Sequence, residues 1–547
     1  MRLAARHLSC AVGVVVAALL MFPSQAFPQA TGTINGRVLD QAEAVIPGVT
    51  ITTTNVRTGI ARVTTTNGEG LYSVPGLDPG VYTVTAELAG FATLRREGVA
   101  LAVTATITVD FNLGLAALAE NVTVAGAAPL IEVTQSKVSG TIRTQEVQSM
   151  PLLTRRFTAL ITMIPGARET APLHPIKRQV GSVSIGGSTG RNIAPIVDGA
   201  DNRDNLVGGP MMSFTLEGTE EFRVNTHQFS ASDGRSGGSS VVLLTKSCTN
   251  EPRGSAFLYG RDRALTKRDY FAARDNIPED PFWRTQFGGS LGGPIIRNRA
   301  FYFGAVEFVR EEKSMTIPDS IYNEVALLRD AGFPVIPAHT IPQPYRDRMY
   351  TLKVNEQVNS KHSLMGRYAG QKHTAFDGIK TPRFMSDLSS MNIEETSYWS
   401  ALGQHNWVAS SRILNQLTVH RNQMIGVSDY TGSKGPGQDP SLYFHTHYPD
   451  VQRLPAMNNL TFPGFSVGMP TTPYNYAQKL WQIKDDLTLQ LGTHTLKMGG
   501  DHSWLPLFGG GCCLYWGRLN FFNDPSTIAR STGVDSRMAD AAPPVPA

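Results

Sequence analysis

The feature that most constrains the fold is the alternation of apolar and polar residues within residues 412–422. The aliphatic side chains of this segment point to one face of an extended strand: Ile413, Leu417 and Val419. Polar side chains point to the opposite face: Gln416, Thr418, His420 and Asn422. Such a strand fits a membrane barrel with lipid outside and a polar lumen inside, and it also fits a soluble sandwich with a buried apolar face.

Strand length and aromatic content favour the barrel. Segments of about ten residues, the length of a tilted strand that crosses a bilayer, recur through the second half of the chain. They comprise residues 255–261, 284–291, 301–310, 349–358, 362–370 and 398–408. Leu487, Leu489 and Leu491 alternate with Thr488 and Gln490 in the same way. We therefore predict antiparallel transmembrane strands over residues 253–547.

The first residues of the chain predict export. Basic residues within 1–7 precede an apolar run at 8–22, which ends at Pro23 and is followed by the small residues Ser24 and Ala26. This pattern is typical of a secretory signal peptide, here residues 1–26, and the run is too short to span a membrane. No other apolar run approaches the roughly 20 residues of a spanning helix, so any membrane crossing would use β-strands.

Charge and cysteine content exclude several classes of function. The 49 basic and 45 acidic residues give a net charge of +4, and no basic block indicates a nucleic-acid partner. Without the signal peptide the cysteines are Cys248, Cys512 and Cys513, too few and too poorly spaced for a disulfide scaffold or a zinc site. A disulfide to Cys248 is one alternative, and unpaired thiols are the interpretation we favour. No arrangement of residues indicates catalysis or a cofactor.

Residues 31–115 predict a small β-sandwich. Short alternating runs are bounded by Gly, Pro, Asp or Asn, at 33–39, 49–55, 61–66, 71–74, 81–88 and 104–113. The aromatic residues Tyr72, Tyr82 and Phe91 fall at alternating positions, where core packing is the default. Carbohydrate binding by these aromatic residues is the alternative.

The central residues predict a compact, loop-rich β unit. Short β-branched runs at 180–185, 193–197 and 239–245 lie between glycine-rich turns. Within residues 155–165 the apolar residues share one helical face, and Pro165 ends the pattern: Phe157, Leu160, Ile161 and Ile164. We predict a short amphipathic helix whose aliphatic face is core.

Several motifs in order carry a family resemblance. Residues 196–202 (IVDGADN), 220–225 (EEFRVN), 234–238 (GRSGG) and 287–294 (FGGSLGGP) resemble the plug domain and barrel entrance of Oar-like TonB-dependent outer-membrane receptors. Residues 36–38, 66–72, 77–84 and 89–91 resemble the transthyretin-like carboxypeptidase-regulatory-like domain that precedes the plug in these receptors. The resemblance implies uptake of a glycan, peptide or metal chelate through a plugged barrel in the outer membrane, with outer-membrane lipid and a TonB-type energy-transducing protein as partners.

Together these patterns predict an all-β chain with an α+β plug. The expected order is a signal peptide (1–26), a sandwich (31–115), a linker (116–128), a plug (129–252) and a partial antiparallel barrel (253–547). The barrel segment holds about nine or ten strands at the spacing seen, near half of the ~22 in plugged transporters. The proline-rich residues 541–547 cannot pair as a strand, whereas members of the resembled family end on an aromatic strand. We therefore expect a C-terminally truncated receptor.

The linker holds the expected partner-binding segment. In the resembled family a short strand-competent segment near this position pairs with the energy-transducing protein by β-augmentation. The corresponding residues here are Glu120, Asn121, Val122, Thr123 and Val124. The alternative is that residues 120–125 form a last strand or tether of the sandwich.

An acidic loop in the plug is the expected ligand contact. It contains Asp198, Asp201, Asn202, Asp204 and Asn205, and the plug loops of the resembled family face the substrate. The spacing does not match an EF-hand, and the turn-forming role of Asp-Gly and Asp-Asn accounts for the cluster without a metal.

A histidine pair and two rival functions complete the prediction. His445 and His447 lie in the Tyr-, Pro- and Gly-rich residues 429–476 without an evident third ligand, so a solvated loop is favoured over a metal site.

A surface adhesion or carbohydrate-binding protein, with the sandwich as working module and the barrel as anchor, is the alternative function. A carboxypeptidase is disfavoured because no HxxE zinc pair occurs.

Overall fold

The computed structural model describes most of the chain after the predicted signal peptide. The described residues are 31–103, 105–115, 122–125, 138–143, 152, 155–170, 182–188, 192–206, 208–227, 236–267, 281–333, 335–376, 387, 392–410, 412–430, 459–467, 474–491, 494–510 and 518–532. The predicted signal peptide, Cys512, Cys513, His445 and His447 lie outside them. None of the helices in these ranges is long and apolar enough to cross a membrane.

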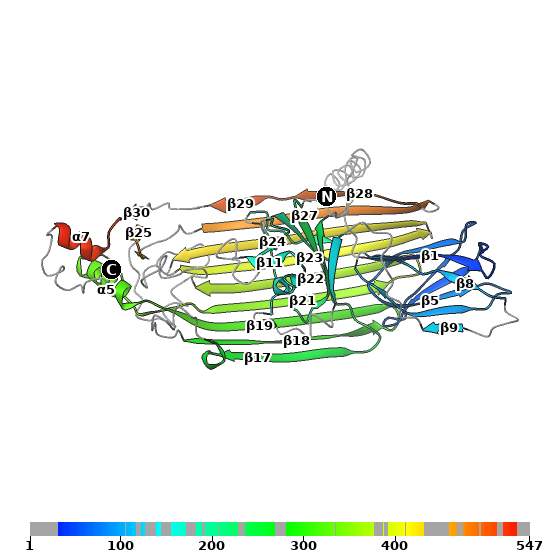
Figure 1. Cartoon of the computed structure of the whole chain (residues 1–547), viewed down its shortest axis with the longest axis horizontal. Coiled ribbons are helices and arrows are strands. Elements are labelled where there is room, and N and C mark those ends of the chain that lie inside the picture. The colour runs from blue at the N-terminus through cyan, green and yellow to red at the C-terminus, as the bar shows by residue number, and fades with distance from the viewer. Residues whose placement is uncertain are drawn as a thin grey trace, which may run out of the picture.

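A long antiparallel sheet, here called the wall, forms the second half of the chain (Figure 1). Its main strands follow one another in sequence order: β17 (Arg253–Asp262), β18 (Phe282–Ile296), β19 (Ala300–Thr316), β21 (Tyr345–Gln357), β22 (His362–Phe376), β23 (Asn392–Ser410), β24 (Ile413–Tyr430), β27 (Tyr474–Leu491) and β28 (His494–Trp504). The short strands β20 (Thr340–Pro342) and β29 (Leu507–Gly510) pair with β19 and β27, which makes the sheet 11-stranded.

The two faces of the wall are those that the alternation predicts. On β24, Leu417 and Val419 are 38% and 42% exposed, whereas Gln416 and Thr418 are 1% and 2% exposed. The apolar face therefore points outward and the polar face points toward the interior. Many strands exceed the predicted ten residues, and β23 has 19.

The wall has one end with short turns and one end with long connections. Short turns join β18 to β19 and β23 to β24, while the connection after β19 contains α5 (Asp319–Asp330). Helices α5 and α7 (Pro525–Thr532) lie at the long-connection end with β25 (Asn459–Thr461), β26 (Ser466–Val467) and β30 (Arg518–Asn520) (Figure 1). A separate apolar cluster of α5 residues and nearby loops, including Val325, Leu328 and Phe465, packs this end.

A β-sandwich lies at the short-turn end of the wall (Figure 1). One sheet contains β1 (Gly32–Asp40), β4 (Leu71–Leu77), β7 (Thr106–Thr108) and β8 (Phe111–Leu113); the other contains β2 (Thr50–Asn55), β3 (Ala61–Thr65), β5 (Gly80–Glu87), β6 (Leu94–Leu101) and β9 (Val122–Ala125). Tyr72 and Tyr82 are 4% and 3% exposed and belong to its core, as predicted. Their hydroxyls donate to the carbonyls of Val109 and Asp78, which satisfies both buried phenols.

The plug is a smaller sheet packed against the polar face of the wall. Its strand order is β10 (Val138–Arg143), β15 (Thr219–His227), β16 (Ser239–Thr245), β13 (Ile193–Val197) and β14 (Ala200–Asp201), with β11 (Ala167–Thr170) paired separately to β12 (Ser182–Ile185). The predicted helix is α3 (Phe157–Ile161), and its Leu160 and Ile161 are fully buried in the plug core. That core also includes Tyr398 and Met424 of the wall, so plug and wall share one apolar cluster.

Candidate functional site: the contact between plug and wall

A tight turn in the plug places one carboxylate against the wall. Residues Asp198 and Gly199 connect β13 to β14, with Val197 opposite Ala200. Both turn residues have positive φ, 49° and 84°, as two-residue hairpin loops of the Asp-Gly type require. The turn predicted from Asp-Gly is therefore present, and it fixes the direction of the Asp198 side chain.

The Asp198 carboxylate is fully buried and bound from both sides of the interface. From the plug, the Thr245 amide donates to Oδ1 at 2.9 Å and the Thr245 hydroxyl donates to Oδ2 at 2.8 Å. From the wall, Lys353 Nζ on β21 lies 3.3 Å from Oδ1, and Arg367 Nη1 on β22 lies 2.8 Å from Oδ2. A buried ion pair therefore joins the plug to two neighbouring strands of the wall.

The two cations also bind other groups of the interface. Lys353 donates to the Thr245 carbonyl at 2.9 Å, and Arg367 donates to the Val197 carbonyl at 3.3 Å. Arg367 Nη2 also donates to the Ser400 hydroxyl at 2.9 Å, which extends the network to β23. These bonds hold the cations in place, so they remain aimed at the carboxylate.

The electrostatic balance keeps Asp198 ionised. Burial disfavours the charged form and by itself would raise the pKa, but attraction to Lys353 and Arg367 and the hydrogen bonds from Thr245 lower the pKa of Asp198 below its usual value. Because Lys353 and Arg367 are both nearly buried, removal of the carboxylate would leave two cations without their counter-charge.

Beyond the turn, the acidic loop binds the wall through its backbone. The Asp201 amide donates to Gln482 Oε1 at 3.1 Å, and the Asp201 carbonyl accepts from Asn422 Nδ2 at 3.2 Å. The Asn205 amide donates to Gln478 Oε1 at 2.7 Å. Neutral amide side chains of β24 and β27 thus hold the loop along the inner face of the wall.

The side chains of this loop have internal partners. Asn202 Nδ2 donates to the Met212 carbonyl at 3.0 Å, Asp204 Oδ1 accepts from the Leu206 amide at 2.8 Å, and Asn205 Nδ2 donates to the Arg203 carbonyl at 3.2 Å. Asp198 and Asp204 are fully buried. The structure thus places the predicted ligand residues together on the wall, and their contact with a ligand stays a prediction.

The sandwich is attached to the plug near the same interface. The Arg57 guanidinium forms an ion pair with Glu220 at 2.8 Å, and the Val103 amide donates to Glu221 Oε1 at 2.9 Å. Arg223 Nη1 donates to the Val103 carbonyl at 3.3 Å. The sandwich, the plug and the wall are therefore linked in series by polar contacts.

The predicted partner-binding segment lies at an edge of the sandwich. Strand β9 pairs in parallel with β6, with Leu94 opposite Val122 and Arg96 opposite Val124. It is the last strand in the order β3-β2-β5-β6-β9. Glu120 and Asn121 lie outside the described residues. The segment forms a strand, as both interpretations require, and its pairing with an energy-transducing protein stays a prediction.

Sequence reasoning missed the wall residues of the site. Lys353 and Arg367 lie on the polar face of predicted strands, and this alternation was the available signal that they point inward. Their shared partner lies more than 150 residues earlier in the chain, and no local pattern specifies such a pairing. Within the described ranges, Cys248 is unpaired and no group of three His, Cys, Asp or Glu side chains is arranged to bind a metal.

Comparison with known proteins identifies the wall and the sandwich. Residues 244–326 and 334–541 match a family described as an outer membrane beta barrel domain, and residues 33–114 match a carboxypeptidase regulatory-like domain. The TonB-dependent transporter Oar of Myxococcus xanthus is 28% identical over 323 residues, which cover 56% of this chain and 29% of that protein. The chain thus spans less than a third of this curated relative.

A solved structure shares the fold. The outer membrane transporter YddB from Escherichia coli superposes with a TM-score of 0.50 at 10% identity, over 68% of this chain and 48% of that one. The comparison supports the arrangement of a plug against an antiparallel wall. The chain therefore belongs to the outer-membrane β-barrel family and is similar to its TonB-dependent transporters.

Proposed function

We propose that this chain acts as the plug-bearing part of a TonB-dependent outer-membrane receptor that takes up a ligand through its barrel. The observation that carries the proposal is the polar contact between plug and wall, centred on Asp198, Lys353 and Arg367. A transporter of this kind needs a plug that closes the lumen at rest and can be displaced when required.

The chemistry of the interface suits such a displacement. Besides the Asp198 ion pair, the loop is held by neutral hydrogen bonds to Gln478, Gln482 and Asn422. Each such bond contributes about 1 kcal/mol net, because water replaces the lost partner when the contact opens. The plug can therefore leave the wall stepwise, with the buried ion pair as the largest single barrier.

The loop provides a route by which a ligand would act on the plug. Along β27, Gln482 and Gln478 lie successively further from the short turn after Leu491, so Asn205 approaches the long-connection end. A ligand that enters between the long connections would meet Asn205 before Asp198. We propose that ligand contact at residues 201–205 loosens the hydrogen bonds to β27. This would in turn weaken the ion pair of Asp198 with Lys353 and Arg367.

The proposed partner contact uses strand β9. A TonB-type protein would pair with residues 120–125 by β-augmentation, which needs a strand-competent segment with a free edge. In the resting structure β9 is bound to the sandwich only through β6 within the described ranges. Release of β9, or pairing on its outer edge, would link the transducing protein to the plug through the linker.

Outer-membrane assembly is tested first. The chain is expressed with its own N-terminus in a Gram-negative host, and the outer-membrane fraction is run on a gel with and without boiling. A shift of migration on boiling supports a folded barrel. Aggregated material without a shift would show that this chain alone does not assemble a barrel and would contradict the proposal.

The partner contact is tested by cysteine cross-linking. The variant T123C places a thiol on β9, and T108C places a matched thiol on β7 of the opposite sheet. With a cysteine-bearing periplasmic domain of the TonB-type protein from the source organism, T123C should form a disulfide-linked product and T108C should not. Equal products from both variants, or none from T123C in an assembled chain, would contradict the proposal.

A further inference from the structure

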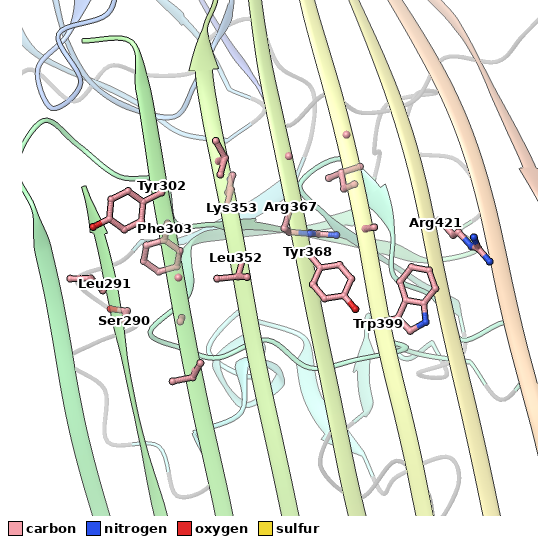
Figure 2. A pocket seen from close by; sticks show the side chains of 18 of the residues that line it. Ser290, Leu291, Tyr302, Phe303, Leu352, Lys353, Arg367, Tyr368, Trp399 and Arg421 are labelled. Atoms are coloured by element: carbon pink, nitrogen blue, oxygen red, sulfur yellow. The ribbon is translucent and has the colours of Figure 1, made fainter. Parts of the chain in front are cut away.

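The outer face of the wall contains an apolar hollow of about 1250 Å³ (Figure 2). It extends from β17 to β27, and exposed apolar side chains surround it: Leu291, Tyr302, Leu352, Val354, Tyr368 and Trp481. These residues lie on the outward face, opposite to the plug. Lys353 and Arg367 also line the hollow, while their side chains bind Asp198 on the inner face, so the hollow lies on the outer side of the same strands as the plug contact.

Missing side chains create the hollow. Gly304 on β19, Gly366 on β22 and Gly403 on β23 line it. Larger residues at these positions would fill the outer surface. A Cβ atom added at Gly366 or Gly403 would meet no atom within 4 Å. The space is thus open to an external molecule rather than occupied by the protein.

A cation lies at one end of the hollow. The Arg421 guanidinium carbon on β24 is 5.4 Å from the ring centroid of Trp399 and 4.4 Å from that of Trp481. Figure 2 shows Trp399 and Arg421 on adjacent strands at this end. Across the strands Arg421 is directly opposite Ala401 on one side and Trp481 on the other, so it belongs to the outward face.

Arg421 lacks an anionic partner within the part of the chain that the structure describes. It forms none of the ion pairs there, and its buried Nε has no hydrogen-bond acceptor. A guanidinium on the lipid face of a barrel costs about 2–4 kcal/mol at the bilayer midplane and about 0–1 near the interface. The two tryptophans offset part of this cost, and an external anion would complete the coordination.

The surrounding residues indicate the height of Arg421 in the membrane. Tyr350 and Trp399 are each opposite Gly370, and such aromatic residues collect at the level of lipid headgroups. One outward position further toward the long connections, Arg348 lies opposite Lys372. Positive charge therefore continues beyond the aromatic residues, where headgroup phosphates would be found.

We propose that this hollow binds a phosphate-bearing anionic lipid of the leaflet near the long connections. One acyl chain lies in the hollow, and the phosphate accepts hydrogen bonds from Arg421 between Trp399 and Trp481. The apolar lining provides the chain site, and Arg421 provides the charge that selects an anionic headgroup. The inference uses the outer-membrane family assignment and does not rest on transport.

Lipid retention by purified protein tests the site. The chain is extracted from outer membranes, exchanged into detergent with equal amounts of phosphatidylglycerol and phosphatidylcholine, and the retained lipid is measured by native mass spectrometry. We expect preference for phosphatidylglycerol, and R421Q should reduce its retention by about tenfold, the effect of one hydrogen bond to a charged group. R421K should keep most of the preference. R412Q, at the short-turn end before the same strand, is the matched control and should behave as the unchanged protein.

A second variant tests the acyl-chain part independently of charge. G403L fills the hollow where the added Cβ meets no atom, and it leaves Arg421 in place. It should lower retention of phosphatidylglycerol while heat-modifiable migration stays normal. Equal retention by R421Q and the unchanged protein, no loss with G403L, or full displacement of lipid by inorganic phosphate would each overturn the proposal.

Discussion

Arg367 of the wall donates a hydrogen bond of 2.8 Å to the Asp198 carboxylate of the plug, and both side chains are buried. Lys353 approaches the other carboxylate oxygen at 3.3 Å. The arrangement gives one anion to two cations, so each wall cation depends on the plug for neutralisation. We infer that this contact dominates the polar attachment of the plug.

Replacement of this carboxylate should loosen the plug. In D198N the two cations stay buried without a counter-charge, and the loss of one member of a buried ion pair costs about 3–5 kcal/mol. We expect a lower midpoint of urea unfolding and faster proteolysis within the plug in isolated outer membranes.

The exposed pair of Arg329 and Asp330 provides the control. Both side chains are more than half exposed, so D330N should change stability by less than about 1 kcal/mol. Equal effects of D198N and D330N would show that the buried network does not anchor the plug.

The same carboxylate should make plug attachment sensitive to acid. The pKa of Asp198 is lower in the folded protein than its unfolded value of about 4, so its contribution to stability is complete above that value. The contribution is lost as the pH falls through the folded pKa, because protonation removes the charge that Lys353 and Arg367 bind.

Protease accessibility of the plug, measured from pH 7 down to pH 3, checks this expectation. The unchanged protein should become more accessible only at the acidic end, below pH ~4. D198N should be accessible throughout and should lack this acidic step. An identical acidic step in D198N would assign the effect to other groups.

Much of the fold could be predicted from local sequence patterns, whereas the ion pair of Asp198 with Lys353 and Arg367 could not. The alternation in β24 predicted which face is polar because each strand residue alternates between lipid and interior. Strand β6 was not predicted, since its charged residues Arg95, Arg96 and Glu97 interrupt the apolar pattern at a sheet position that is largely exposed.

Long-range pairing explains the other differences. Strand β23 begins at Asn392 rather than near Tyr398, because its polar first residues extend the ladder through backbone bonds that require no apolar alternation. Helix α5 was also not predicted within the wall, although Val325 and Leu328 pack it against distant loops. Such contacts depend on the assembled topology.

Substitution of a buried tyrosine tests whether the aromatic residues of the sandwich serve as core or as a carbohydrate-binding surface. The Tyr72 hydroxyl donates to the Val109 carbonyl at 2.5 Å, and burial raises the pKa of this phenol above its usual range. Y72F should destabilise the sandwich by about 0.5–1.5 kcal/mol, the net value of a typical hydrogen bond. Thermal unfolding followed by near-ultraviolet circular dichroism measures this loss, and an unchanged profile would contradict a core role.

Gln478 should hold the acidic loop against β27. Its Oε1 accepts from the Asn205 amide at 2.7 Å, and its Nε2 donates to the Arg203 carbonyl at 2.9 Å. Q478A removes both bonds and leaves two partly buried backbone groups without this partner, at a cost of about 1 kcal/mol per lost bond. We expect proteolysis of the loop to accelerate while proteolysis at the Asp198 turn changes less, because Lys353 and Arg367 still hold that turn.

The matched control is Q423A on β24. Gln423 also has an amide side chain, and it follows the inward-facing Asn422, so it lies on the outward face of the wall. It removes a side chain of the same size without touching the plug, so the rate of loop proteolysis should match that of the unchanged protein. If Q423A and Q478A accelerated cleavage equally, the effect would come from a weakened wall, and a specific role of Gln478 in holding the loop would be excluded. If only Q478A did so, release of the loop at β27 would precede release at Asp198, the order expected when a ligand enters from the long-connection end.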